Sequence, residues 1–242
     1  MDCADLSKKL AETLGLGIKP VAVKFLKPGE AIPEGFALPS RRMRFCQAVM
    51  EAGWGRALAI LPNEMACGPG PGSFGGLVKE KVSKGEVHHA FGLFESDDAA
   101  AKCLGANTKM MPGSVSAVLV APLSECRMEP DTVIVRVNAE QAMWLCHSRA
   151  FHEGKHLTFD VQTEACLCSG MAVAPYLKNE VQLGFGCYGS RSNTDLSANE
   201  ILVGIPGCML KIVVAALERL GKPIGEAKAK KGFYQVYPEK SA

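Results

Sequence analysis

The sequence lacks any apolar run long enough to cross a membrane. A membrane-spanning helix needs roughly 20 consecutive apolar residues, whereas the longest apolar stretches here cover only 117–123 and 212–217. Residues 1–16 mix acidic and basic side chains into a helical pattern of leucines, so the apolar core of a signal peptide is also missing. We therefore expect a cytoplasmic protein that does not contact a membrane.

The sequence also lacks an excess of charge of one sign. Its 242 residues include 27 basic and 25 acidic side chains, which gives a formal net charge of +2. Nucleic-acid binding relies on clustered positive charge, so we expect no nucleic-acid partner. The run at 41–44 contains three arginines, too few for a phosphate-backbone site, and its size suits docking of an acidic redox partner.

Common signatures of nucleotide binding and catalysis are missing too. The glycine-rich segment 68–76 has neither the lysine nor the following serine or threonine of a phosphate-binding loop. No paired carboxylates, Ser-His-Asp arrangement or reactive Cys-His motif can be identified. We interpret segment 68–76 as a loop that wraps a metal centre, and the alternative is an ordinary turn.

The histidines form no convincing metal motif. Adjacent residues on a strand point to opposite faces, so His88 and His89 on a predicted strand cannot easily bind the same ion. His147, His152 and His156 have near-helical spacing, but a glycine interrupts the helix before the last of them. We expect these three side chains to lie on the surface.

The chain is 48% hydrophobic, which is enough for one large core. Alternation of apolar and polar residues predicts strands, and spacing of three to four residues predicts helices. The mixture predicts an α+β fold in which 1–242 form a single domain with a basic C-terminal tail at 223–242. The predicted strands are 20–26, 56–61, 87–94, 116–122, 131–137, 157–161, 181–185 and 201–205. The predicted helices are 1–16, 45–52, 97–104, 139–150, 206–220 and one that follows residue 163.

Two parts of the chain resemble each other in the order of their elements. Cys46 stands 21 positions before Cys67, and Cys166 stands 21 positions before Cys187. We interpret this as an internal duplication with half-repeats 18–110 and 114–222, each read as strand-helix-strand-strand-helix and related by a pseudo-twofold axis. Chance similarity is the alternative. A twofold arrangement would bring the equivalent cysteines together where the halves meet.

Ten cysteines are the most unusual feature that is present. Disulfide frameworks are typical of small secreted chains, and we expect this chain to be neither. Four thiolates suit an iron-sulfur cluster or a structural zinc. Zinc sites usually place ligands in CxxC pairs, and the sequence contains no CxxC, so a 4Fe-4S cluster is favoured and zinc is the alternative cofactor. The predicted ligands are Cys46, Cys67, Cys166 and Cys187.

The neighbours of these cysteines suit ligands. Glycines beside Cys67 and Cys187 allow backbone N–H groups to approach sulfur. Cys166 is two positions from Cys168, which is the substitute ligand. Arg191 lies close to Cys187 in sequence and suits binding of the cluster charge or of an anionic substrate, with a surface salt bridge as the alternative. The other cysteines lie within or beside helix or strand patterns and are predicted to be packing residues: Cys3, Cys103, Cys126, Cys146 and Cys208.

Four segments carry a resemblance to a known family: RFCQAV, MACGPG, APLSECRMEPDTVIVRVNAEQAM and GFGCYGSRSNTD. They resemble the corresponding segments of the DUF169 family, which is found in many anaerobic bacteria and archaea. The likeness covers almost the whole chain, and the long third segment is its most specific part. The resemblance implies a common fold and a cysteine-based centre. It implies no reaction, because the family has no settled activity.

Together these features predict a cysteine-ligated iron-sulfur protein with a redox or small-molecule role. One alternative is a metal-free enzyme that uses Cys168 or Cys187 activated by Arg191. Another is a zinc-stabilised interaction module. We expect a redox partner protein or a small-molecule substrate, and homo-oligomerisation remains an open alternative.

Overall fold

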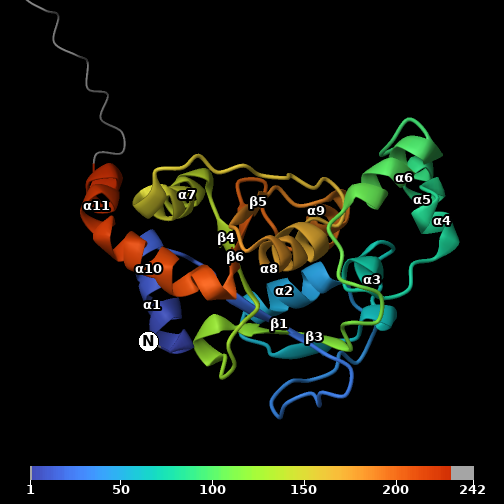
Figure 1. The fold of residues 1–242 in the computed structure, drawn as a ribbon, viewed down its shortest axis with the longest axis horizontal. Helices are drawn as coiled ribbons and strands as arrows, with labels where there is room; N and C mark the ends of the chain where they lie inside the picture. Colours follow the sequence, from blue (N-terminus) through green and yellow to red (C-terminus); the bar gives the residue numbers. More distant parts are fainter. Residues whose placement is uncertain (1, 230–242) are drawn as a thin grey trace, which may run out of the picture.

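The computed structural model describes residues 2–229 and contains a six-stranded sheet in which every neighbouring pair is antiparallel (Figure 1). The strand order is β2-β3-β1-β4-β6-β5. Helices combined with this sheet confirm the predicted α+β class. The strands are β1 (Val21–Leu26), β2 (Leu58–Ile60), β3 (Ala117–Pro122), β4 (Thr132–Val137), β5 (Gln182–Gly184) and β6 (Ile201–Pro206).

One face of the sheet packs on a core that contains several cysteines. Strand residues Val23, Val118 and Ile134 are fully or almost fully buried in it, together with Phe45 of a covering helix. Phe25 adds an edge contact with Tyr176, whose ring centroid lies 5.2 Å away. The elements that contribute to this layer are α2 (Phe45–Gly53), the π-helix η3 (Cys166–Val173), α8 (Ala174–Lys178) and α9 (Tyr188–Asn193).

The opposite face packs on a second core. Val133, Val135 and Val203 alternate along their strands with the residues of the first core, so they point to this side. Leu10 and Leu145 are completely buried against them. The helices of this layer are α1 (Cys3–Leu14), α7 (Ala139–Glu153), α10 (Leu210–Arg219) and α11 (Gly221–Ala229).

Short helices occupy the long connection between β2 and β3 and extend to one end of the molecule (Figure 1). They are α3 (Gly70–Ser73), α4 (Glu80–Ser83), α5 (Glu86–Ala90) and α6 (Asp97–Ala106). Three 3-10 turns complete the described chain: η1 (Pro62–Glu64), η2 (Leu123–Glu125) and η4 (Gly207–Met209). Turns η2 and η4 follow β3 and β6 directly, and each is entered through the proline that ends the strand.

The strand pairing of the sheet has twofold symmetry about the point where β1 meets β4. Ala22 lies opposite Val133 where β1 meets β4. A twofold rotation about this point places the pair Val21–Ile134 on the pair Val23–Thr132. The same rotation converts the β1–β3 ladder into the β4–β6 ladder and the β2–β3 ladder into the β5–β6 ladder, residue for residue. The equivalent ranges are 21–26 with 132–137, 58–60 with 182–184, and 117–122 with 201–206.

This register groups β3 with β1 and β2. The symmetric parts of the sheet therefore run from 21 to 122 and from 132 to 206, rather than dividing between 110 and 114. The similarity that the sequence suggested between β1 and β4 agrees with their equivalent places in the sheet. A common origin of the two halves by duplication stays a prediction.

The predicted strand at 87–94 is wrong, because α5 occupies this region. Gly85 and Gly92 flank the helix with φ of +84° and +73°, left-handed values that a regular strand does not contain. The apolar alternation in this segment came from residues of a short helix and its exit turn.

The predicted strand at 157–161 is also wrong, since the structure forms no ladder there. Leu157 and Phe159 are half-buried and their neighbours are exposed, which explains the alternating pattern. A strand also needs a partner for its backbone groups, and this requirement is not visible in the pattern. The helix predicted after residue 163 exists, but it begins as a π-helix.

The end of the chain is only partly described. Residues 221–229 form α11, and the rest of the predicted basic tail at 223–242 lies outside the described residues. Between residues 2 and 229, no helix combines the length and apolar character that a bilayer crossing requires.

Candidate metal centre

Five cysteines from separate segments converge on the first core. Cys46 is in the first turn of α2, Cys67 follows β2, and Cys187 immediately precedes α9, while η3 supplies the other two. The thiols are close enough for the charge of one to raise the pKa of another: Cys187 acts on Cys46, Cys67 and Cys166, and all four act on Cys168. The structure therefore brings the four predicted ligands together and adds Cys168 to them. Their role as ligands stays a prediction.

This thiol cluster, defined as Cys46, Cys67, Cys166, Cys168 and Cys187, is mostly covered. Cys46, Cys166 and Cys168 are buried, and Cys67 and Cys187 are half-buried. Burial raises the pKa of Cys46 to about 12 and that of Cys166 to about 12. Because the thiolate is the reactive form, such thiols are poor nucleophiles when no metal is bound.

Backbone groups approach the sulfurs closely. The N–H of Gly186 donates to Sγ of Cys166 at 3.3 Å, and a backbone hydrogen bond from Gly70 counteracts part of the burial-induced rise in the pKa of Cys67. A Cβ atom at Gly184 would lie 2.6 Å from Sγ of Cys166, and one at Gly70 would lie 3.4 Å from Sγ of Cys67. The glycines therefore leave space that the sulfurs of Cys166 and Cys67 occupy. The sequence predicted such contacts at Cys67 and Cys187, and the N–H of Gly186, beside Cys187, donates to Cys166 instead.

Arg44 is a residue of the cluster that the sequence analysis assigned elsewhere. A Cβ atom on Gly189 would meet Nη1 of Arg44 at 3.3 Å and Sγ of Cys187 at 3.8 Å, so both groups border the same glycine. Burial raises the pKa of Cys67, and the charge of Arg44 and its hydrogen bond oppose that rise. The position of Arg44 two residues before Cys46 was the only signal available, and its membership of a basic run obscured it.

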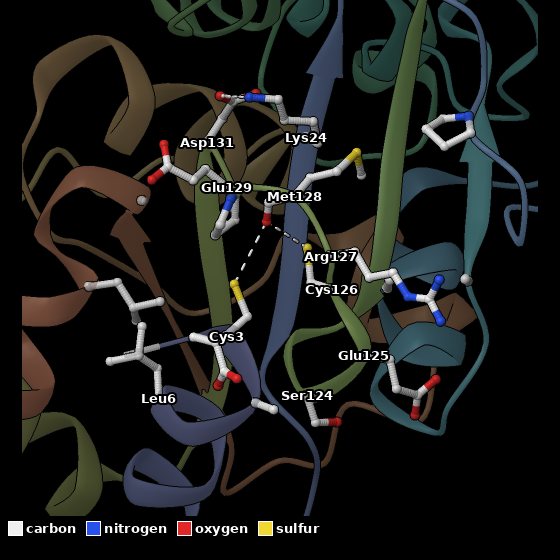
Figure 2. Close-up of a pocket in the computed structure, with 18 of the residues that line it drawn as sticks. Cys3, Leu6, Lys24, Ser124, Glu125, Cys126, Arg127, Met128, Glu129 and Asp131 are labelled. Carbon is white, nitrogen blue, oxygen red and sulfur yellow. Dashed lines mark hydrogen bonds and ion pairs between the residues drawn. The ribbon is translucent and has the colours of Figure 1, made fainter.

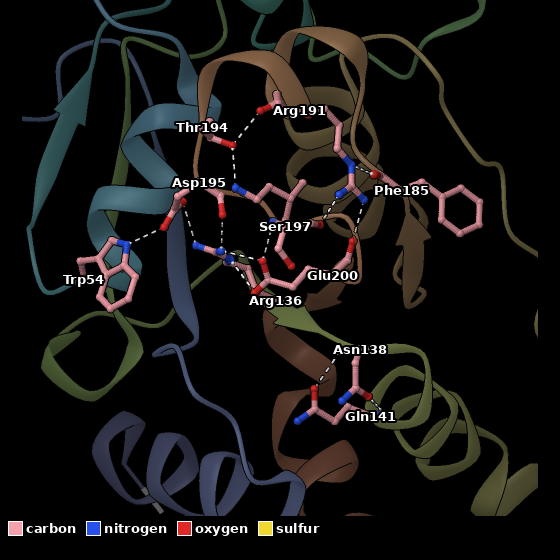
Figure 3. Close-up of polar contacts among 12 residues, drawn as sticks. Trp54, Arg136, Asn138, Gln141, Phe185, Arg191, Thr194, Asp195, Ser197 and Glu200 are labelled. Carbon is pink, nitrogen blue, oxygen red and sulfur yellow. Dashed lines mark hydrogen bonds and ion pairs between the residues drawn. The ribbon is translucent and has the colours of Figure 1, made fainter.

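Arg191 stabilises the loop that follows Cys187. Its Nε donates to the carbonyl of Phe185 at 2.8 Å, one Nη donates to the carbonyl of Glu200 at 2.6 Å, and the other donates to that of Ser197 (Figure 3). Burial raises the pKa of Cys166, and the charge of Arg191 opposes part of that rise. Arg191 therefore acts on the cluster from a distance, with each guanidinium nitrogen already donating to a carbonyl.

The π-helix η3 presents Cys166 and Cys168 to the cluster. It is eight residues long and starts after Ala165, whose φ of +52° lies in the left-handed region that costs non-glycine residues energy. Thr132 of β4 donates to the carbonyl of Ala172 at 2.8 Å, and Ser169 donates to the carbonyl of Thr108 at 2.5 Å. π-Helical segments are rare and are frequently found at functional sites. No sequence pattern indicated this one.

A single metal ion and an iron-sulfur cluster need different arrangements of sulfur ligands. Over residues 2–229, no three His, Cys, Asp or Glu side chains form a group with the geometry to hold one metal ion. A single zinc with Zn–S distances of about 2.3 Å holds its four sulfurs within roughly 4 Å of one another. The cysteines that bind a 4Fe-4S cluster are farther apart, because each binds a different iron.

Comparison with known proteins places the chain in a family. Residues 9–216 match the DUF169 family, which is described as uncharacterised ArCR. This chain belongs to the DUF169 family. The uncharacterized protein MJ0308 of Methanocaldococcus jannaschii is 28% identical to it over 215 residues, which cover 88% of this chain and 92% of that protein. No solved structure is similar to the chain.

Most of the other features that the sequence of this DUF169 chain suggested lie outside the cluster. The helix α5 carries His88 and His89, and only His88 is buried. Cys103 approaches the hydroxyl of Thr163 at 3.7 Å. Cys3, Cys126 and Cys208 line a groove away from the cluster. The glycine-rich segment 68–76 does border the cluster, since Gly70 packs against Cys67.

Proposed function

We propose that this DUF169 protein binds a 4Fe-4S cluster through Cys46, Cys67, Cys166 and Cys187. The observation that carries the proposal is the convergence of thiols from α2, the β2 exit, η3 and the β5 exit onto one mostly buried position. Ligands that are far apart in sequence can bind one cluster only if the fold brings their sulfur atoms close together. Cys168 is the substitute ligand.

The surroundings of the sulfurs support a charged sulfur-ligated group. Hydrogen bonds to thiolate sulfur and nearby positive charge both stabilise the reduced state of an iron-sulfur centre. Gly186 supplies an N–H to Cys166, and Arg44 supplies charge beside Cys67. Free thiols whose pKa is raised by burial would gain little from these groups, whereas metal-bound thiolates are stabilised by them.

The sequence is our reason for proposing a cluster rather than zinc. Zinc sites usually place their ligands in CxxC pairs, and the sequence contains none. Burial raises the pKa of Cys168, one of the two candidate nucleophiles of the metal-free thiol enzyme, well above its usual range, which reduces its thiolate population and disfavours it in that role.

When bound, the cluster would supply one-electron exchange. The chain would hold it between α2 and η3 and exclude water from the sides formed by Cys46, Cys166 and Cys168. The half-buried side at Cys67 and Cys187 is where we place approach of a redox partner protein or a small-molecule substrate. The ten unpaired cysteines suit the reducing cytoplasm, which is part of this proposal.

Anaerobic purification followed by iron, zinc and acid-labile sulfide analysis tests the proposal. We expect about four irons and about four sulfides per chain, as a 4Fe-4S centre requires. Alanine variants of Cys46, Cys67, Cys166 and Cys187 should each lose most of the iron. Cys146→Ala is the matched control, because Cys146 lies on α7 in the other layer.

The same experiment separates the alternatives. Cys168→Ala keeps its iron if the four named cysteines are sufficient, and loses it if Cys168 is a ligand. Zinc without sulfide would favour the interaction module. Normal iron content in all four variants, or an anaerobic protein with neither metal, would remove the proposal.

A further inference from the structure

A large groove lies on the side of the sheet that faces away from the thiol cluster. Lys24 and Ala121 line it, and they alternate along their strands with Val23 and Val120, which point into the core that contains the cluster. The groove has a volume of about 1380 Å³ and runs along the start of α1 and the β3–β4 connection (Figure 2). A site here is therefore separate from the proposed metal centre.

Two cysteines meet in this groove. The thiols of Cys3 and Cys126 both donate to the carbonyl oxygen of Met128, at 3.7 and 3.1 Å (Figure 2). Because the two sulfurs share this acceptor they are neighbours, and when Cys126 is deprotonated the thiol of Cys3 can donate to it instead. Cys3 begins α1 and Cys126 follows η2, so the pair joins segments that are more than 120 positions apart in sequence. Both are half-buried at the groove wall, where a small molecule can reach them.

The surroundings make the two sulfurs unequal. Burial raises the pKa of both thiols. For Cys126, the hydrogen bond from Cys3 and the charge of Lys24 oppose the rise, whereas a charge on Cys126 raises the pKa of Cys3 further. The charge of Lys24 favours a thiolate at Cys126, whereas the charges of Asp2 and Glu129 oppose one at Cys3. We therefore assign the first attack to Cys126 and the second to Cys3.

We propose that Cys3 and Cys126 form a thiol-disulfide exchange site for low-molecular-weight disulfides, which convert the pair reversibly into an intramolecular disulfide. The sulfur of Cys126 attacks the small disulfide, breaks its S–S bond and releases one small thiol, leaving a mixed disulfide. The sulfur of Cys3 then attacks that of Cys126 and releases the second small thiol. Two protons and two electrons pass from the cysteines to the small disulfide, which is reduced to two thiols.

The disulfide would tie the first turn of α1 to the β3–β4 connection. A crosslink between such distant positions reduces the conformational entropy of the unfolded chain. We expect the thermal midpoint of the oxidised protein to rise by about 5 to 10 °C, and to return when dithiothreitol is added.

The test uses full-length, anaerobically purified protein and oxidised glutathione at pH 8. Samples are quenched with N-ethylmaleimide, digested and examined by mass spectrometry, with the iron content measured in parallel. We expect a peptide pair linked through Cys3 and Cys126. In Cys3→Ser the reaction should stop at a glutathione adduct on Cys126, and in Cys126→Ser the adduct on Cys3 should form at least several-fold more slowly.

Cys208→Ser is the matched control, because Cys208 lines the same groove but hydrogen-bonds to Asn179 instead. This variant should form the Cys3–Cys126 link at the normal rate. Adducts on both cysteines without a link, or links that join Cys208 as often as Cys126, would overturn the proposal. Loss of iron in the starting protein would count against the metal centre and leave this result unaffected, because the two sites lie on opposite faces.

Discussion

At the scale of single residues, the pair His88 and Glu164 shows how burial can prevent charge. Nε2 of His88 lies 3.6 Å from the Glu164 carboxylate, which is within reach of an ion pair. Burial nevertheless lowers the pKa of His88 and raises that of Glu164 to about 7. Nδ1 of His88 has no hydrogen-bond partner, so an imidazolium would bury an unpaired donor. We therefore describe both side chains as mostly neutral at pH values below the pKa of Glu164 and above the lowered pKa of His88.

Glu164 should make stability depend on pH. The carboxyl binds its proton more tightly in the folded state, because its pKa rises from 4.5 to about 7. Its contribution is therefore present below pH 4.5 and is lost as the pH rises through 7. The shift corresponds to roughly 3 kcal/mol at most. Urea unfolding between pH 4.5 and 7.5 should show that the difference between wild type and Glu164→Gln decreases by an amount of this order across the window.

The matched control for this prediction is Glu12→Gln, because Glu12 is exposed on α1. This substitution should change the free energy of unfolding by no more than about 0.5 kcal/mol, as exposed substitutions usually do. His88 acts with the opposite sign, since its lowered pKa gives stability that is lost as the pH falls below 6.5. Comparing each variant with wild type at the same pH removes this contribution. A pH-independent difference for Glu164→Gln would contradict the prediction.

Gly184 is a second residue with a specific expectation. A Cβ atom at this position would lie 2.6 Å from Sγ of Cys166 and 3.0 Å from Cε of Met171. Gly184→Ala should therefore lower the free energy of unfolding by about 1 to 3 kcal/mol through overpacking. It should also reduce the iron content if Cys166 is a ligand. Chemical denaturation and metal analysis of the same preparation measure both effects.

Gly105→Ala is the control for this change. A Cβ atom there meets nothing within 4 Å, and the residue lies in α6. Alanine in a helix is more favourable than glycine by up to about 1 kcal/mol, so the control should be as stable as wild type or more stable. Equal unfolding free energies and equal iron contents of the two variants would show that a side chain at position 184 does not disturb Cys166.

At the scale of elements, Arg136 connects β4 with the segment between α9 and β6. Its guanidinium is buried and contacts the carboxylates of Asp195 at 3.0 Å and Glu200 at 2.7 Å (Figure 3). Trp54, just after α2, donates to the other oxygen of Asp195 at 2.8 Å. These contacts hold α2 and the loop after Cys187 in fixed positions, which the thiol cluster requires.

Removing this arginine should be costly. In Arg136→Ala, Glu200 and Asp195 keep their charges without the cation, and we expect a loss of about 2 to 4 kcal/mol in unfolding free energy. Arg56→Ala removes an exposed ion pair with Glu51 and should cost less than about 1 kcal/mol. Urea denaturation of both variants measures the difference. Similar losses of unfolding free energy in the two variants would mean that burial does not increase the contribution of Arg136 to stability.

The strongly patterned elements could be predicted from the sequence. The strands β3, β4 and β6 and the helices α6 and α7 agree with their predicted positions to within a few residues. Their apolar spacing or caps are local: Asn138 and Gln141 form the capping box of α7 through hydrogen bonds of 2.8 and 2.9 Å. Helix α5 was predicted wrongly because its two flanking glycines have left-handed φ values that end the helix on either side. The segment 157–161 was predicted wrongly because it pairs with no strand.

At the scale of the whole molecule, the two halves of the sheet share structure. β1 and β4 pair across the centre, and the thiol cluster combines Cys46 and Cys67 from one half with Cys166 and Cys187 from the other. Neither half could bury this surface alone. We therefore expect the described chain to unfold in one cooperative step.

Each half contains one tryptophan, and this allows a direct test. Trp54 follows α2 and Trp144 lies in α7. In Trp144→Phe the fluorescence reports Trp54, and in Trp54→Phe it reports Trp144. Within each variant, the fluorescence midpoint in urea should coincide with the far-ultraviolet circular dichroism midpoint. Two separated transitions in either variant would show that the halves are independent domains.

The sequence by itself determined which cysteines to examine and the α+β class, because glycine neighbours and apolar periodicity are local properties. It named Cys168 only as a substitute ligand, and it did not place Arg44 beside the sulfurs or bring Cys3 and Cys126 together. Only the tertiary structure decided these points. Residues far apart in sequence become neighbours through strand order and helix packing, and no single segment encodes those contacts.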